Sequence, residues 1–366
     1  MSKTINTRLA GGLVLSLVLA CDGAETAATF LGANSCASSS CHGGGGANQN
    51  QFLVWSLKDF HSQRPAATLA TARSKQIADA LEIKDPAADA RCTTCHAPLR
   101  EVPAAQRGDN FKASEGVSCE SCHGPAENWL RAHTRHDWTH ADRTAAGMRD
   151  LENLYVRANT CVACHQNVEA DILKAGHPEL IFELDGQSVG EPKHWSVEKN
   201  GNGAQVWLVG QAVALREMSW QARREKTNDL RADGLLPIIF RANQVDARLP
   251  AVPDNLTIAE WSDQVAKTAA NLTWSDDLTK KYLSLLANDS TTFHNNSVPQ
   301  TLQARRAERL VLALDRLVAA LPEMKDNQPV QAALNQLFKL AQSIPDFDTK
   351  QFAGALDKFS VAIAAH

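Results

Sequence analysis

The spacing of apolar residues divides the chain into two regions with different patterns. Beyond about residue 202, apolar residues recur every three or four positions over long stretches, as they do on one face of a helix. Before that point the apolar runs are short, and Gly, Pro, Ser and His interrupt them. The pattern therefore predicts short helices and loops in the first region and long helices in the second. One helical face of the second region is formed by Leu310, Leu314, Leu317 and Leu321.

Capping residues set the expected limits of several helices in the second region. A long helix with a basic end is expected over residues 204–226. Thr257 and Glu260 have the spacing of a capping box, and Ser275 can cap the helix that follows. Asp348 opens the last helix. The apolar positions expected inside that last helix are Phe352, Leu356, Phe359 and Ile363.

Four short helices are expected in the first region, at residues 52–61, 68–83, 127–133 and 149–159. Pro86 ends the second of them. No segment with the period of a strand is longer than a few residues. The sequence therefore predicts a mainly α fold with little regular sheet.

Eight of the nine cysteines stand in pairs, and a histidine directly follows each pair. The spacing Cys-x-x-Cys-His is the signal for covalent attachment of a c-type haem. Each sulfur can form a thioether with one vinyl group of the porphyrin, and the histidine reaches the iron. Three regular sites are Cys92, Cys95 and His96; Cys119, Cys122 and His123; and Cys161, Cys164 and His165.

A stretched version of the motif precedes the three regular ones. Cys36 and Cys41 have four residues between them, and His42 and a run of glycines follow. The extra residues must loop out for both sulfurs to reach the porphyrin, which serines and glycines permit. The alternative is a glycine-serine loop with chance cysteines. Zinc binding and a thioredoxin-like role are rival interpretations of all the pairs, but a histidine after every pair favours haem.

The sequence thus predicts four covalently bound haem c groups, with no disulfide and no free thiol in the mature fold. The four motif histidines are expected to fill one axial position on each iron. A second histidine would make an iron six-coordinate, whereas a missing one would leave a site for small molecules. The histidines outside the motifs are His61, His133, His136, His140, His177, His194, His294 and His366.

The four-site layout, the run from Gly116 to Ala126 and the following His133 resemble the cytochrome c-554 family. Its members are tetrahaem electron carriers that accept electrons from hydroxylamine oxidoreductase in ammonia-oxidising bacteria. The resemblance covers residues 34–195. It implies that His61 binds the third haem and His133 the fourth. It also implies that His177, with His194 in reserve, binds the first.

The same resemblance implies that the second haem, held by His96, has no protein ligand on its far side. A lone histidine is nevertheless more often a surface or hydrogen-bonding residue than a ligand. His194 could instead lie in a turn beside a packed indole, while His136 and His140 could lie near haem propionates or face water. The two histidines far down the chain, His294 and His366, are not expected to be ligands.

The first 20 residues are expected to be a signal peptide, because Lys3 and Arg8 precede a short apolar run. Cys21 follows a sequence that resembles a bacterial lipobox, so lipidation of Cys21 and a tether over residues 21–35 are expected. The alternative is an ordinary cleaved leader with an incidental cysteine. Because c-type haem is attached outside the cytoplasm, the expected location is the periplasm, with a lipid anchor in the membrane.

Two domains are expected after the tether: a tetrahaem cytochrome c domain at residues 36–200 and a helical domain at residues 201–366. No internal run reaches the roughly 18 apolar residues that span a bilayer. The formal net charge is −4, and removal of the leader would make it more negative. Such a surface argues against nucleic-acid binding and is compatible with a basic redox partner.

The expected function is electron transfer between a donor oxidoreductase and an acceptor cytochrome or membrane quinone system, rather than catalysis. The alternative is an enzyme that binds or reduces nitric oxide, nitrite or hydroxylamine at the open haem of His96. The sequence has no Cys-x-x-Cys-Lys motif, and its only tyrosines are Tyr155 and Tyr282. A third possibility is that the helical domain docks a partner or the membrane.

Overall fold

The computed structural model describes residues 27–46, 49–194, 202–252, 255–295, 297–343 and 346–365. The expected signal peptide, Cys21 and His366 lie outside this part of the chain, as does the first part of the expected tether. Within it the chain is helical, and its only β-type pairing is one isolated bridge between Phe30 and Arg107. This confirms the predicted mainly α fold.

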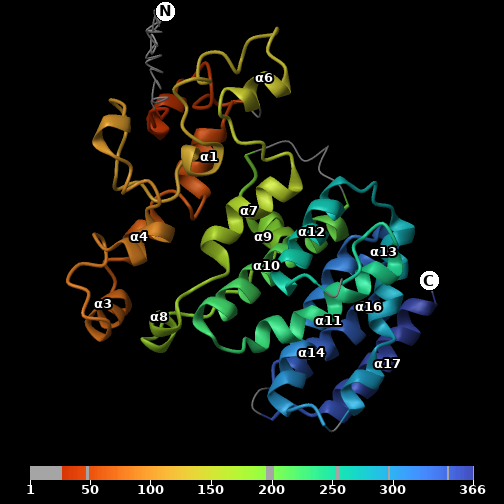
Figure 1. Ribbon diagram of the computed structural model, residues 1–366. Coiled ribbons are helices and arrows are strands. Elements are labelled where there is room, and N and C mark those ends of the chain that lie inside the picture. The colour runs from red at the N-terminus through yellow and green to blue at the C-terminus, as the bar shows by residue number, and fades with distance from the viewer. Residues whose placement is uncertain are drawn as a thin grey trace, which may run out of the picture.

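The first region consists of short helices joined by loops and turns (Figure 1). Its elements are η1 (Ala33–Cys36), α1 (Gln51–Lys58), α2 (Arg64–Thr68), α3 (Ala72–Ala80), α4 (Ala90–His96), η2 (Ala104–Gln106), α5 (Cys119–His123) and α6 (His140–Ala145).

The structure departs from the prediction at two of the helices expected in this region. The helix expected over residues 68–83 is shorter in the structure, where α3 covers only Ala72–Ala80. It begins late because Thr71 leaves the helical conformation and caps α3 by accepting a hydrogen bond from Ser74. Residues 127–133 form successive turns rather than a helix. Their backbone hydrogen bonds mix the two spacings, with Trp129 bonded to Ala126 and His133 bonded to Trp129.

Three helices connect the two regions: α7 (Leu154–His165), α8 (Ala170–Lys174) and α9 (Leu184–Gly190). The expected helix over residues 149–159 begins later, because Asn153 caps it by accepting hydrogen bonds from the backbone of Tyr155 and Val156. It also runs further than expected and carries the fourth cysteine motif at its end.

The second region contains the long helices that the apolar pattern predicts. The expected helix over residues 204–226 is confirmed, and so are the caps at Thr257, Ser275 and Asp348. Its elements are α10 (Gly203–Glu225), α11 (Leu230–Val245), α12 (Ile258–Asn271), α13 (Asp276–Ala287), η3 (Ser290–His294), α14 (Gln300–Ala319), α15 (Pro322–Lys325), α16 (Gln328–Ala341) and α17 (Thr349–Ala364).

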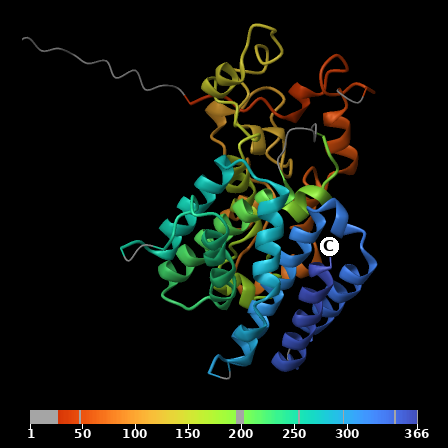
Figure 2. The ribbon, with the colours of Figure 1, turned by 90° about the vertical axis from the view of Figure 1, so that its right-hand side faces the viewer.

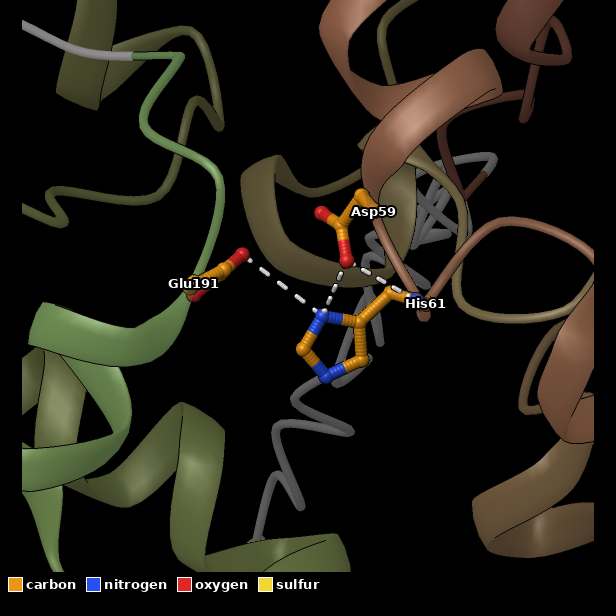
Figure 3. Close-up of side chains that lie close together, drawn as sticks. All are labelled: Asp59, His61 and Glu191. Atoms are coloured by element: carbon orange, nitrogen blue, oxygen red, sulfur yellow. Dashed lines mark hydrogen bonds and ion pairs between the residues drawn. The ribbon is translucent and has the colours of Figure 1, made fainter.

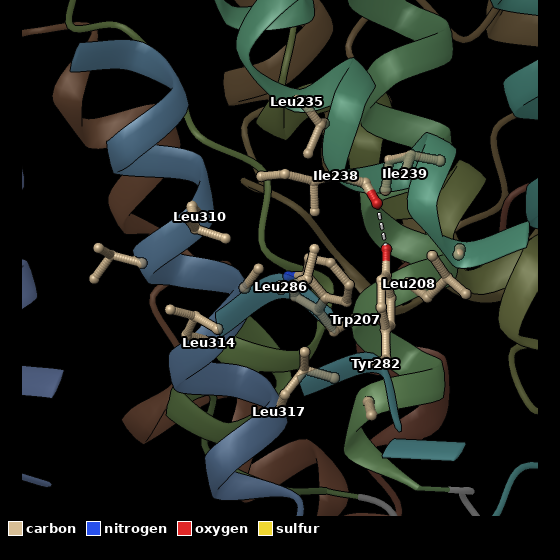
Figure 4. Close-up of a cluster of buried hydrophobic side chains, with 14 of the residues drawn as sticks. Trp207, Leu208, Leu235, Ile238, Ile239, Tyr282, Leu286, Leu310, Leu314 and Leu317 are labelled. Carbon is tan, nitrogen blue, oxygen red and sulfur yellow. Dashed lines mark hydrogen bonds between the residues drawn. The ribbon is translucent and has the colours of Figure 1, made fainter. Parts of the chain in front are cut away.

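A continuous apolar core lies between these long helices (Figure 4). Leu310, Leu314 and Leu317 of α14 project into it, as their spacing predicts. Trp207 of α10 packs beside the ring of Tyr282, whose hydroxyl donates a hydrogen bond of 2.5 Å to the Ile238 carbonyl. The buried phenol therefore has a partner for its only polar group, as burial requires.

The core extends into the fourth cysteine motif but not into the earlier motifs. Leu154, Ala158 and Val162 of α7 belong to it, as do Phe182 and Leu184, and no residue before Leu154 does. Helix α7 packs against α10, while the residues before about 150 lie largely outside the helical bundle in both overall views (Figures 1 and 2). The fourth motif is therefore anchored in the core of the second region.

None of the helices in the described ranges combines the length and the apolar character that a membrane span requires.

Candidate haem-binding site

Helices present the cysteines of the three regular motifs. The second motif ends α4, the third forms α5 and the fourth ends α7. Side chains three residues apart lie on the same side of a helix, so each Cys-x-x-Cys pair offers two neighbouring sulfurs. Each helix begins at a polar cap, formed by Asp89, Ser118 and Asn153 respectively.

The first motif forms turns instead of an α-helix. The N–H of Cys41 donates to the carbonyl of Ser38 at 2.9 Å, and the N–H of His42 donates to the carbonyl of Cys36 at 3.3 Å. Gly43 lies so close to this turn that a Cβ atom at its position would be 1.9 Å from the Ala37 carbonyl oxygen. The glycine that follows the motif is thus required by the path of the chain.

Three motif histidines each have a second histidine ring nearby. Ring centres are 6.1 Å apart for His42 and His133, 6.5 Å for His96 and His177, and 5.9 Å for His165 and His61. Two imidazoles that share one metal through bonds of about 2 Å hold their ring centres roughly 6 Å apart. The spacing of all three pairs therefore fits an iron between the two rings.

The remaining motif histidine, His123 of the third motif, lies in a partly buried cluster of histidines. Burial, together with the neighbouring His194 and His42, lowers the pKa of His123 to about 4. Two histidines outside the motifs, His194 and His133, lie near His123. Because the ring of His133 is already paired with that of His42, His194 is the candidate partner of His123. The neutral form of imidazole is the form that binds metal, so a lowered pKa suits a ligand.

These ring contacts differ from the pairings that the family resemblance implied. His61 lies beside the fourth motif rather than the third, and His133 beside the first rather than the fourth. His177 lies beside the second motif rather than the first. The motif histidine His96, expected to face an open position, therefore has a histidine ring opposite it.

Hydrogen bonds explain why His61 and His177 lie where they do. The backbone carbonyl of His61 accepts a hydrogen bond from the N–H of Val117, next to the third motif. Its ring nevertheless lies away from that motif, because its Nδ1 contacts Asp59 and Glu191. Arg73 of α3 donates two hydrogen bonds, of 2.6 and 3.2 Å, to the carbonyl of Gly176. This interaction holds the loop with His177 near the second motif.

In four of these histidines the ring nitrogen Nδ1 contacts an uncharged oxygen. The Nδ1 of His42 is 2.9 Å from the side-chain oxygen of Gln51, and that of His96 is 2.8 Å from a backbone carbonyl. The Nδ1 atoms of His133 and His177 are 2.6 and 2.8 Å from backbone carbonyls. An Nδ1 that donates to such an oxygen leaves Nε2 for a metal, which is the usual arrangement around metal-binding histidines.

His61 differs because two carboxylates face its Nδ1 (Figure 3). The distances are 3.1 Å to Asp59 and 3.5 Å to Glu191. Hydrogen bonds to Asp59 and then to Glu191 raise the pKa of His61 to about 10. The three side chains could themselves surround a cation, but the ring of His61 also contacts that of His165, which favours its role beside the fourth motif.

The motif cysteines form two close pairs between motifs. Cys36 of the first motif lies beside Cys119 of the third, and Cys95 of the second lies beside Cys164 of the fourth. The neighbouring thiol, and after it burial, raises the pKa of Cys119 and of Cys164. The first motif therefore lies next to the third, and the second next to the fourth. No disulfide joins any of the eight cysteines that the structure describes.

The sequence reasoning missed Glu120, which lies between the two cysteines of the third motif. Its carboxylate is 1 % exposed and accepts three backbone hydrogen bonds, from Leu31 at 2.9 Å, Gly32 at 2.7 Å and Ala126 at 2.7 Å. These bonds hold the chain that leads to the first motif against the third motif. The only sequence signal for this role is an acidic residue within a haem motif.

Three other described histidines, His136, His140 and His294, do not lie beside a motif histidine. Nε2 of His140 contacts the carboxylate of Asp150 at 3.1 Å, and the side chain of His140 is half exposed. His136 and His294 are exposed. Among the described residues, no ring contact joins any of these three to a motif histidine.

Comparison with known proteins supports the haem interpretation for the first part of the chain. Residues 35–124 match the family model of cytochrome c554 and c-prime. This segment contains the first three motifs and His61, while the fourth motif lies beyond it. No curated protein and no solved structure matches the chain. Residues 35–124 are thus similar to the cytochrome c554 family, which suggests a c-type cytochrome with covalently bound haem that acts in electron transfer.

Proposed function

We propose that this protein is a tetrahaem c-type cytochrome of the periplasm that transfers electrons between redox partners. The observation that carries the proposal is the spacing of about 6 Å between a motif histidine and a second histidine in three places. The attachment residues of the four haems are Cys36, Cys41, Cys92, Cys95, Cys119, Cys122, Cys161 and Cys164.

Two histidines of this chain would hold each haem. The pairs that the structure brings together are His42 with His133, His96 with His177, His165 with His61, and, through their electrostatic proximity, His123 with His194. When bound in this way, a haem supplies a one-electron couple of its iron. The protein holds both imidazoles in place through their Nδ1 contacts, so that few groups have to move when the charge of the site changes.

Closed axial positions favour a carrier over an enzyme. A small-molecule reductase needs one motif histidine without a ring opposite to it. The resemblance implied an open position at the haem of His96, but the ring centre of His177 lies 6.5 Å from that of His96. Reduction of nitric oxide, nitrite or hydroxylamine remains the alternative function, and it requires that His177 leave this position.

The contacts between motifs support electron exchange within the protein. Cys36 of the first motif lies beside Cys119 of the third, and Cys95 of the second lies beside Cys164 of the fourth. Haems attached at these positions would be neighbours, so an electron could pass between the first and third haems and between the second and fourth without leaving the protein.

The proposed location and partners follow from the sequence. Attachment of c-type haem takes place outside the cytoplasm, and the segment before Cys21 has the features of an export signal. Acylation of Cys21 would then tether the protein to the membrane. The net negative charge favours a donor or acceptor with a basic docking surface, such as an oxidoreductase, another cytochrome or a quinone-linked complex.

Carbon monoxide binding to the reduced protein separates the carrier from the enzyme. The proposal predicts that the native protein shows no spectral change with carbon monoxide, because both faces of every iron are occupied. His177→Ala should open one haem, so that carbon monoxide binds one equivalent per chain. His140→Ala is the matched control and should leave the spectrum unchanged.

Carbon monoxide binding by the native protein would contradict the closed second site. Turnover of nitric oxide, nitrite or hydroxylamine by the native protein at a rate that His177→Ala changes would establish the alternative enzyme function.

A further inference from the structure

The histidines of the site differ in what their Nδ1 atoms contact. In the pairs beside the first and second motifs, all four Nδ1 atoms lie next to an uncharged group. In the pair beside the fourth motif, Nδ1 of His165 is 3.3 Å from the side-chain amide of Gln187, whereas Nδ1 of His61 faces two carboxylates. The electrostatic surroundings of the fourth motif therefore differ from those of the first and second.

The carboxylate of Asp59 is held rigidly next to His61. Asp59 is 5 % exposed, and its Oδ1 accepts a hydrogen bond of 2.8 Å from the backbone N–H of His61. The same oxygen is 3.1 Å from Nδ1 of the His61 ring. One carboxylate oxygen thus fixes both the backbone and the ring of this histidine.

Glu191 comes from a part of the chain that also contacts the opposite histidine. It ends α9, and its N–H donates to the carbonyl of Gln187 at 2.9 Å. The side chain of Gln187 contacts His165, while Glu191 itself contacts His61 (Figure 3). Helix α9 begins in the core of the second region, at Leu184, and this gives Glu191 a fixed support.

We propose that Asp59 and Glu191 are positioning residues that make the imidazole of His61 a more strongly electron-donating ligand of the iron. They thereby hold the reduction potential of the fourth haem below those of the first and second haems. This inference rests on the proposed function. A carboxylate that accepts the Nδ1 proton gives the imidazole more anionic character, which stabilises the oxidised iron. The two negative charges favour the oxidised iron as well.

A low potential assigns a place to the fourth haem in the transfer of electrons. It is the last of these three haems to accept an electron and the first to pass one on. The fourth motif is also the one anchored in the helical region, through α7. An electron that reaches it therefore leaves readily for the neighbouring second motif or for an acceptor.

The test is a redox titration of the holoprotein, followed by electron paramagnetic resonance so that the individual haems are resolved. In the double variant Asp59→Asn with Glu191→Gln, the lowest-potential component should move to a more positive value, toward the others. Asp59→Asn alone should cause more of this shift than Glu191→Gln alone, because Asp59 is closer to Nδ1 and more deeply buried. Glu191→Asp should keep most of the native potential, because the charge remains.

Gln51→Glu is the converse variant. It offers a carboxylate to the Nδ1 of His42, where the native amide oxygen is at 2.9 Å. The potential of the first haem should fall, and a second low-potential component should appear. This result does not depend on whether the Asp59 variants fold.

The outcomes distinguish the inference from the proposed function. Four low-spin haems whose lowest component stays in place in the double variant, with no new low-potential component in Gln51→Glu, would overturn the inference and leave the tetrahaem cytochrome intact. A native protein without low-spin haems would overturn the proposed function, and the inference with it.

Discussion

Residues 27–153 and helices α10–α17 differ in how much apolar surface they bury. In the helical region one continuous core joins the long helices, and the side chains of Trp207, Trp261 and Phe352 are almost completely buried in it. The first region contributes no residue to that core. Its buried apolar side chains are few and mostly small: Ala33, Cys36, Val54, Leu69, Ala78, Ala97, Val102, Ala126 and Trp129.

The difference shows where each region obtains its stability. The helical region buries enough apolar surface to be stable without a cofactor. In the first region, most of the motif cysteines and their histidines are only partly buried. A region of this size without a core of its own needs a cofactor, and porphyrin rings would supply the missing apolar surface. Helix α7 belongs to both parts, because it carries a motif and packs in the core.

The largest expected effect follows from preventing haem attachment. Chain produced without haem, or with Cys119→Ala and Cys122→Ala, should lose protection from hydrogen exchange over residues 27–153, because that region loses its apolar interior. Helices α10–α17 should keep their protection, which serves as the internal control. Hydrogen exchange with mass spectrometry measures both at once, and equal protection of the two regions in haem-free chain would contradict the comparison.

A truncation in the core should affect the helical region. Leu314 is fully buried, so Leu314→Ala should lower the free energy of unfolding by about 2–5 kcal/mol. Val361 lies on the surface of α17, so Val361→Ala is the control and should change it by less than about 0.5 kcal/mol. Denaturant unfolding followed by circular dichroism measures the difference. A similar loss in both variants would show that α14 does not carry the core.

Two carboxylates with buried oxygen atoms, Glu183 and Glu120, extend the comparison to polar groups. Glu183, at the junction with the helical region, has an oxygen without a hydrogen-bond partner among the described residues, and burial raises its pKa to about 7. A carboxyl with a raised pKa stabilises the fold below its unfolded pKa near 4.5, and this stability is lost as the pH rises through 7. Relative to the native chain, Glu183→Gln should therefore gain up to about 3 kcal/mol between pH 4 and pH 8.

The measurement for Glu183 is the difference in unfolding free energy between the two proteins across this pH range, so that the other titrating groups cancel. A difference that does not change with pH would show that the pKa of Glu183 is the same in the folded and unfolded states.

Glu120 is the contrasting carboxylate in the first region, where three N–H groups surround it. Glu120→Gln should destabilise the link between the first and third motifs by about 1–3 kcal/mol, because at least one buried N–H loses its acceptor. Glu127→Gln is the control, since Glu127 accepts from the backbone of Thr29 at an exposed site. Faster hydrogen exchange at Leu31 and Gly32 in the first variant alone is the expected result. Equal rates in both variants would contradict a structural role for Glu120.

The local features of this protein could be predicted from its sequence, because local chemistry determines them. The helix caps at Thr257, Ser275 and Asp348 and the apolar face of α14 follow from spacings of three or four residues. The cysteine motifs follow from a spacing of the same length.

Contacts between distant parts of the chain could not be predicted in this way. The ring of His61 lies next to His165, more than 100 positions away, because Asp59 and Glu191 orient it. The role of Glu120 likewise depends on a chain segment about 90 residues earlier. The resemblance to a family placed the candidate histidines but not their partners, since partners depend on how the loops pack.

The mass of the purified, exported protein tests the central claim most directly. Thioether-linked haem stays attached when the chain is denatured, so the mass of the denatured chain counts the haems without reference to their potentials or ligands. The mature chain is expected to carry the added mass of four haems. A mass that corresponds to fewer than three, or a colourless protein, would contradict the account.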